Sequence, residues 1–204
     1  MACVYLLVWT NFLAQFGVSG FFIVQPLLMK TTFGWAEGPF SLLMTGMVLT
    51  MALTQIKAFP ALRKQLGLMC IGLIASFGSS FSILAYLAVK APTAIDSTLW
   101  LAAVLLGMFL VALIGPVVSI LMGDLVDLLG VGALMSFSSA AEQAGRIIAP
   151  LALGVIYENS CDGAIYAWSA AQFVAGGLLG VFAWLSAPLL QKPLPQSFKD
   201  LIMC

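Results

Sequence analysis

The residues of this chain best placed to do chemistry are Glu142 and Arg146, which stand together in a stretch otherwise free of charge. An acid four positions before a base shares a helix face with it, and this order favours an intrahelical ion pair. At about 100° per residue, an arc of about 120° on the same face also holds further polar side chains: Ser136, Ser139 and Gln143. Two interpretations stay open, a self-neutralised structural pair and a pair that binds a substrate or exchanges a proton or ion.

The composition explains why such a pair stands out. The chain is 62% hydrophobic and only 8% charged, whereas an average soluble domain is about 25% charged. Placing a charge in a lipid bilayer costs at least about 2.5 kcal/mol on insertion scales. We therefore predict an integral multi-pass membrane protein in which the deep charges mark a functional site.

Long charge-free runs predict the positions of the membrane spans. A helix needs about 20 mostly apolar residues to cross a bilayer, and runs of this length are too continuous for the alternating strands of a membrane barrel. We expect an all-α membrane domain over residues 1–187 and a cytoplasmic tail over 188–204. The six predicted transmembrane helices cover residues 4–29, 39–56, 67–89, 98–122, 129–157 and 164–187.

The first predicted span carries a second polar stripe. Asn11, Gln15, Ser19 and Gln25 fall within an arc of about 120° on one side of the helix. Such a stripe avoids lipid, so it either bonds to neighbouring helices or forms a wall facing a solute. The residues that would bind the solute, taken from both stripes, are Asn11, Gln15, Gln25, Ser139, Glu142, Gln143 and Arg146.

Glycine and proline inside spans predict bending points. Proline removes one backbone hydrogen bond from a helix and bends it, and in a membrane the freed carbonyl needs another partner. Gly115 and Pro116 lie within the fourth span and Pro150 within the fifth. We expect these three residues to serve as kinks or gates, although proline is also common in membrane helices for other reasons.

Basic residues outside the spans predict the orientation. Lys57, Arg63, Lys64, Lys192 and Lys199 would lie on one side, against Lys30 and Lys90 on the other. The side richer in Lys and Arg is normally cytoplasmic. Both termini are therefore expected in the cytoplasm, whereas the identity of the membrane stays open.

Several function classes are disfavoured. The chain has no histidine, and its four cysteines have no metal-ligand spacing. No serine with a base and no paired intramembrane aspartates are visible, so we do not expect an enzyme. No cofactor is predicted, and the absence of a basic cluster disfavours nucleic acid as a partner.

Three segments, in order, resemble a known family. They are FGWAEGPFSLLMTGMVLTMALTQIKAFPALRKQLG, LLGMFLVALIGPVVSILMG and GALMSFSSAAEQAGRIIAPLALGVIYE, within residues 33–158. They resemble the eighth span with its flanking loops, the tenth span and the eleventh span of major facilitator superfamily transporters. The pattern is closest to the drug/proton antiporter branch, which includes tetracycline efflux proteins. The chain would then be the carboxyl-terminal six-helix half of such a carrier.

The resemblance implies a fold and a function. The fold would be one half of a facilitator-type bundle, built from two inverted three-helix repeats. The first, second, fourth and fifth spans would line a central cavity, with the third and sixth outside it. The function would be transport of a small organic solute by alternating access, with proton coupling at Glu142 as one option and Arg146 holding an anion or steering Glu142.

The departures from the family define the alternatives. The amino-terminal half is absent, and the turn KAFPALRKQLG lacks the acidic residue of the family's first-half turn. Alternating access needs two bodies, so the expected partners are a second six-helix half, the solute, protons and the lipid bilayer. The chain looks as though it begins in the middle of something longer. The alternative is a truncated or non-transporting membrane protein that acts as an interaction or regulatory partner.

Overall fold

A computed structural model describes residues 2–34, 37–88, 94–124 and 131–186, and in these segments the chain is helical, with no strand. Long apolar runs leave the backbone no hydrogen-bonding partners except its own, which favours continuous helices. The α-helices are α1 (Ala2–Leu28), α2 (Glu37–Leu53), α3 (Phe59–Leu66), α4 (Leu68–Leu84), α5 (Ala94–Asp124), α6 (Val131–Asn159) and α7 (Cys161–Ser186). Three short turns of other helical type adjoin them: η1 (Met29–Phe33), η2 (Thr54–Ala58) and η3 (Ala85–Ala88).

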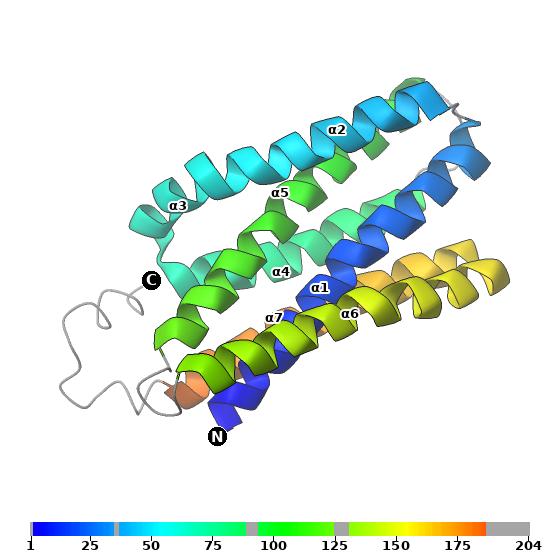
Figure 1. The fold of residues 1–204 in the computed structure, drawn as a ribbon. Coiled ribbons are helices and arrows are strands. Elements are labelled where there is room, and N and C mark those ends of the chain that lie inside the picture. The colour runs from blue at the N-terminus through cyan, green and yellow to red at the C-terminus, as the bar shows by residue number, and fades with distance from the viewer. Residues whose placement is uncertain (1, 35–36, 89–93, 125–130, 187–204) are drawn as a thin grey trace.

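The helices run back and forth along one axis (Figure 1). Five helical stretches in the described part of the chain are long and apolar enough to cross a membrane: Tyr5–Thr31, Gly38–Leu66, Leu68–Ala88, Asp96–Gly123 and Asp162–Ala183. They overlap five of the six predicted spans. The fifth predicted span, 129–157, corresponds to α6. This helix is long enough to cross a membrane, but its mean hydropathy is too low for it to be counted with the other five. The tail predicted at 188–204 lies outside the described residues.

The segment from Lys57 to Gly67, which we expected to be a turn, is helical. Helix α2 continues through the π-helical turn η2 into α3 and stops only at Gly67, whose φ of 73° favours glycine. Pro60 does not break this helix because it lies in the first turn of α3, where its missing N–H is tolerated. The polar segment therefore extends the helix instead of closing a loop.

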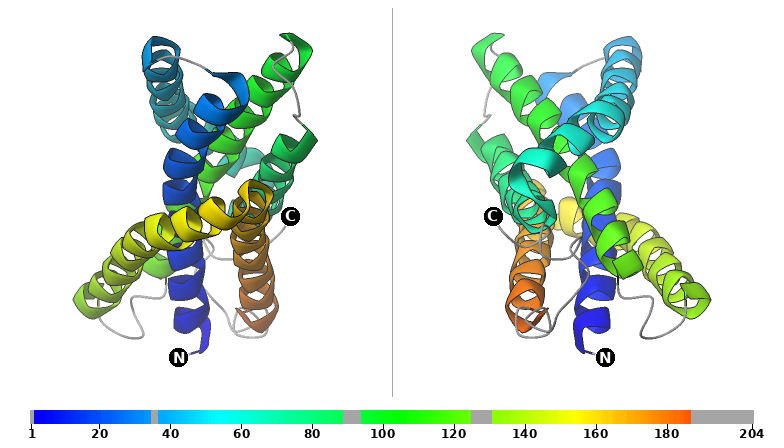
Figure 2. Two further views of the ribbon diagram at one scale, coloured as in Figure 1. Left: turned by 90° about the vertical axis from the view of Figure 1, so that its right-hand side faces the viewer. Right: turned by 90° about the vertical axis from the view of Figure 1, so that its left-hand side faces the viewer.

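The long helices form an interlocked arrangement, seen end-on in the two views of Figure 2. Helices α2 and α6 lie on one side, α4 and α7 on the other, and α1 and α5 cross between them. Helix α1 packs mainly against α6 and α7, whereas α5 packs mainly against α4. The first helix of each half of the chain thus packs on helices from the other half.

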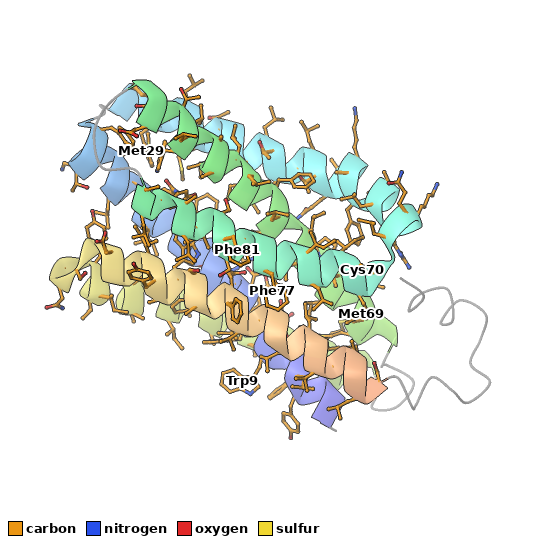
Figure 3. All side chains as sticks on the ribbon, turned by 180° about the vertical axis from the view of Figure 1, so that it is seen from behind. Trp9, Met29, Met69, Cys70, Phe77 and Phe81 are labelled. Carbon is orange, nitrogen blue, oxygen red and sulfur yellow. The ribbon has the colours of Figure 1, made fainter. Side chains whose placement is uncertain are left out.

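The core contains polar contacts as well as apolar ones. Helix α4 buries four serines, Ser76, Ser79, Ser80 and Ser82. The last three of them form hydrogen bonds to α7 or α5. The Ser80 and Ser169 hydroxyls lie 2.8 Å apart, and the Ser82 hydroxyl donates to the carbonyl of Ala103 at 2.6 Å. Cys70, in the first turn of α4 (Figure 3), is disulfide-bonded, which the cysteine spacing did not predict.

Candidate functional site

The site is built around a close contact between α1 and α6. A Cβ atom on Gly145 would lie 2.5 Å from the carbonyl oxygen of Phe12 and 3.1 Å from the backbone nitrogen of Phe16. Real side chains do not approach backbone this closely, so glycine is required here for the helices to touch. Short distances between the backbones allow side chains one turn away to reach the opposite helix. Gly145 thereby sets the spacing of the site.

On the amino-terminal side of Gly145, Asn11 ties α1 to α6. Its Nδ2 donates to Ser138 Oγ at 2.9 Å and to the Ser138 carbonyl oxygen at 3.3 Å. Asn11 is 6% exposed and Ser138 is 8% exposed. This contact satisfies the amide inside the bundle, which corresponds to the packing interpretation of the first polar stripe.

Next to this contact, Gln15, Glu142 and Arg146 form a charged group that bridges the two helices, here called the polar triad. Arg146 donates from Nε to Gln15 Oε1 at 3.2 Å and from Nη2 to Glu142 Oε1 at 2.5 Å. The side chains of Arg146 and Glu142 are 48% and 29% exposed. Because the triad is only partly covered, a molecule arriving beside α6 can reach both charges.

The triad lies near the middle of α6. At 1.5 Å of rise per residue, Glu142 is about 16 Å from the helix start at Val131 and Arg146 is about 20 Å from the helix end at Asn159. A helix of this length can cross the hydrocarbon core of a bilayer, which is about 30 Å thick. The charges therefore lie close to the midpoint of the helix.

The two sides of the α1–α6 contact differ in polarity. One side carries the exposed residues Ser139 and Gln143 beside the triad. The other is an apolar groove of about 580 Å³ with Trp9 projecting outward at its edge (Figure 3). It is lined by Tyr5, Val8, Trp9, Phe12, Phe137, Ala140, Ala141, Ala144 and Ile148. Phe137, Ala144 and Ile148 thus occupy the opposite face of α6 from the charges, as the helical periodicity indicates.

The predicted site residues divide into groups. Asn11, Gln15, Glu142 and Arg146 come together at the α1–α6 contact. Ser139 and Gln143 lie exposed on the same side of α6, and the neighbouring Ser138 makes the interhelical bond instead of Ser139. Gln25 is separate. It is fully buried in another part of the core, about 15 Å further along α1 than Gln15 at 1.5 Å per residue.

The predicted bending points lie within unbroken helices. Pro116 is inside α5 and Pro150 is inside α6, and both helices continue past them. Gly115 is half-buried, and a Cβ there would meet no atom within 4 Å, so close packing does not require glycine at this position. Their role in gating stays a prediction.

Sequence reasoning missed a buried link between three helices. Gln172 of α7 donates from Nε2 to the carbonyl oxygen of Leu13 at 3.2 Å and lies 3.5 Å from the Ser79 hydroxyl. A Cβ on Gly17 would overlap this side chain, so the small residue on α1 makes room for it. One glutamine in an otherwise apolar span, with a glycine on a neighbouring span, was the signal available.

No group of three or more His, Cys, Asp or Glu that could hold a metal ion occurs among the described residues. Comparison with known proteins does not place the chain in a family. No family model, no curated protein and no solved structure matches it.

Proposed function

We propose that this chain is one half of a facilitator-type secondary carrier that moves a small organic solute across a membrane by alternating access. The observation that carries the proposal is the polar triad. Charges in the middle of a helix of membrane-spanning length are costly to bury in lipid and usually mark a functional site. Here Arg146 also donates a hydrogen bond to Gln15 on a second helix. The partial exposure of both charges leaves them open to a ligand.

The arrangement of the helices supports this proposal. Helices α1 to α4 and helices α5 to α7 each run three times along the bundle (Figure 1), and the first helix of each group packs on the other group. Two interlocked three-helix units are what inverted repeats would produce. In this interpretation the face with the triad meets the second six-helix body.

The roles of the triad follow from its chemistry. Arg146 offers several N–H donors, of which two are used, so it can bind an anionic or carbonyl group of the solute. Glu142 would be the site for a proton or a cation, because its carboxylate becomes free when Arg146 turns to a ligand. Gln15 would keep Arg146 directed at α1 between cycles.

The test is solute flux in cells that lack their own drug efflux pumps. Cells expressing the full chain should accumulate less tetracycline or ethidium than cells with an empty vector, and Glu142→Gln or Arg146→Gln should abolish the difference. Glu158→Gln, which changes an exposed acid at the end of the same helix, is the matched control and should leave the flux intact.

The alternative is an interaction or regulatory membrane protein that does not transport. It predicts that wild-type and Glu142→Gln cells show the same accumulation of every solute, while membrane fractions contain equal amounts of both chains. That result, obtained in cells that also supply the second six-helix half, would count against the carrier proposal.

A further inference from the structure

Helix α6 contacts the rest of its chain along one narrow line of residues. Among the residues whose side chains the structure describes, its buried positions are Ser138, Gly145, Ala149 and Leu153. Their spacing along the sequence places all of them on one face of the helix. The other described positions of α6 are exposed or only partly covered. A helix of membrane-spanning length is therefore left largely uncovered by its own chain.

Part of this uncovered surface is polar. It is called here the α6 stripe, and it consists of Ser136, Ser139, Glu142, Gln143 and Arg146. The stripe is about 15 Å long at 1.5 Å of rise per residue. Acyl chains offer no hydrogen bonds to these groups, and charges that face lipid are costly. The stripe therefore needs a covering other than lipid.

Both charges of the stripe can form further hydrogen bonds. Arg146 has five N–H donors, of which one bonds to Gln15 and one to Glu142. Glu142 accepts through Oε1, whereas its Oε2 has no partner among the described residues. The covering partner should therefore offer an acceptor to Arg146 and a donor to Glu142.

The α6 stripe is complementary to itself when two copies pair in the same membrane. A two-fold symmetric interface brings the same surface of both copies together, and an axis along the bundle places each residue at the same depth in both. At about 100° per residue, Glu142 and Gln143 lie on opposite sides of a line through Ser139 and Arg146. With the axis in front of that line, Gln143 of one copy lies opposite Glu142 of the other. Long side chains lean toward the start of their helix, which brings Arg146 toward the same level.

We propose that two copies of this chain pair in the membrane through the α6 stripe, with a two-fold axis along the bundle. Arg146 and Gln143 of each copy donate to Glu142 of the other, and the two Ser139 hydroxyls lie near the axis. A copy carries the required donors and acceptors at matching depths, which an unrelated partner would have to reproduce. In one respect this rests on the proposed function, because it identifies the second six-helix body with a copy of the chain.

The first test is cross-linking in membranes, with the four native cysteines replaced by serine. A cysteine at Ser139 should be joined to its counterpart by a short bifunctional maleimide, which gives a band at twice the 21.6 kDa of the chain. The matched control is Asp162→Cys, exposed in the first turn of α7 on the other side of the bundle (Figure 2). Both cysteines should take up a monofunctional maleimide, but only the first should cross-link. Equal cross-linking of the two, or none at Ser139, would overturn the proposal.

The second test asks whether the charges hold the copies together. Glu142→Gln and Arg146→Gln chains with different affinity tags are made in one cell. A mixed pair keeps one Arg146 opposite one Glu142, whereas a pair of identical variants keeps no such contact. Co-purification of the mixed pair should exceed that of either variant with itself by roughly tenfold, as expected for a polar contact between membrane helices. Equal co-purification of all three pairs would contradict the predicted contact.

The number of wild-type chains per particle separates this proposal from the carrier proposal. Photobleaching of the fluorescently tagged full chain in lipid nanodiscs should show two steps, and this measurement needs no solute. Single steps at every protein concentration would overturn the pairing and leave the carrier proposal to a separate second half. Two steps without solute flux would support the pairing and count against the carrier proposal.

Discussion

Arg146 of α6 donates to the side chain of Gln15 on α1 at 3.2 Å while it also binds Glu142 of its own helix at 2.5 Å. The ion pair is thus held by a second helix as well as by its own. Any movement of α1 relative to α6 changes the environment of both charges. This coupling of helix position to charge environment underlies the predictions about the triad.

The ion pair should behave as a unit in stability measurements. Changing Glu142 to Gln leaves Arg146 without its counter-charge, and changing Arg146 to Gln does the same to Glu142, whereas the double variant leaves no unpaired charge. We expect each single variant to have a lower Tm in detergent than the double variant. A double variant whose Tm loss equals the sum of the two single losses would show that the charges do not stabilise each other.

Replacement of Gly145 by Ala should weaken the α1–α6 contact. The added methyl would lie 2.5 Å from the Phe12 carbonyl oxygen, and relieving such a clash costs typically 1–3 kcal/mol, here expected at about 2 kcal/mol. Gly154→Ala is the matched control on the same helix, because a Cβ there meets nothing within 4 Å. It should be neutral or raise stability by up to about 1 kcal/mol. Thermal unfolding of both variants compares them directly.

Thiol labelling should distinguish the two sides of α6. With the four native cysteines replaced by serine, a cysteine at Gln143 or Ser139 should react with a membrane-impermeant maleimide in intact cells or inverted vesicles. A cysteine at Ile148 or Leu151, also exposed in the isolated chain, should not react because lipid covers it. Equal reactivity on both sides of the helix would contradict the expectation that water reaches the side of α6 that carries the triad.

The positions of the basic residues predict the topology. Arg63 and Lys64 at the end of α3 lie at the same end of the bundle as the start of α1 (Figure 1), whereas Asn159 and Ser160 lie at the opposite end. A reporter tag inserted after Lys64 should be cytoplasmic and one inserted after Asn159 external. The reverse result would show that the difference in basic residues does not set the orientation.

The sequence predicted those structural features that depend on a pattern within a single helix. Charge-free runs predicted the long helices, and the four-residue spacing predicted the pairing of Glu142 with Arg146. Periodicity also separated the polar and apolar sides of α6. These features depend only on residues within one helix, so a single sequence contains them.

The remaining features depend on how helices meet. Gln15 and Gln25 belong to one stripe, but only Gln15 reaches α6, because a stripe shows which face of a helix is polar and not which neighbour covers each turn. Asn11 bonds to Ser138 and not to Ser139 because of how α6 is rotated about its own axis, and the sequence of α6 alone does not specify that rotation. The helix through residues 57–66 was missed because its polar composition resembles that of a loop.

The interlocked packing also has a consequence for synthesis at the ribosome. Helix α1 finds its main partners in α6 and α7, whose sequences begin at Val131 and Cys161. At 5–20 residues per second, the start of α6 is made about 7 to 26 s after α1 begins. During this interval the newly synthesised α1 has no contact with α6, so Asn11 and Gln15 lack their hydrogen-bonding partners. The translocation machinery or a membrane chaperone therefore has time to bind α1 before α6 and α7 are made.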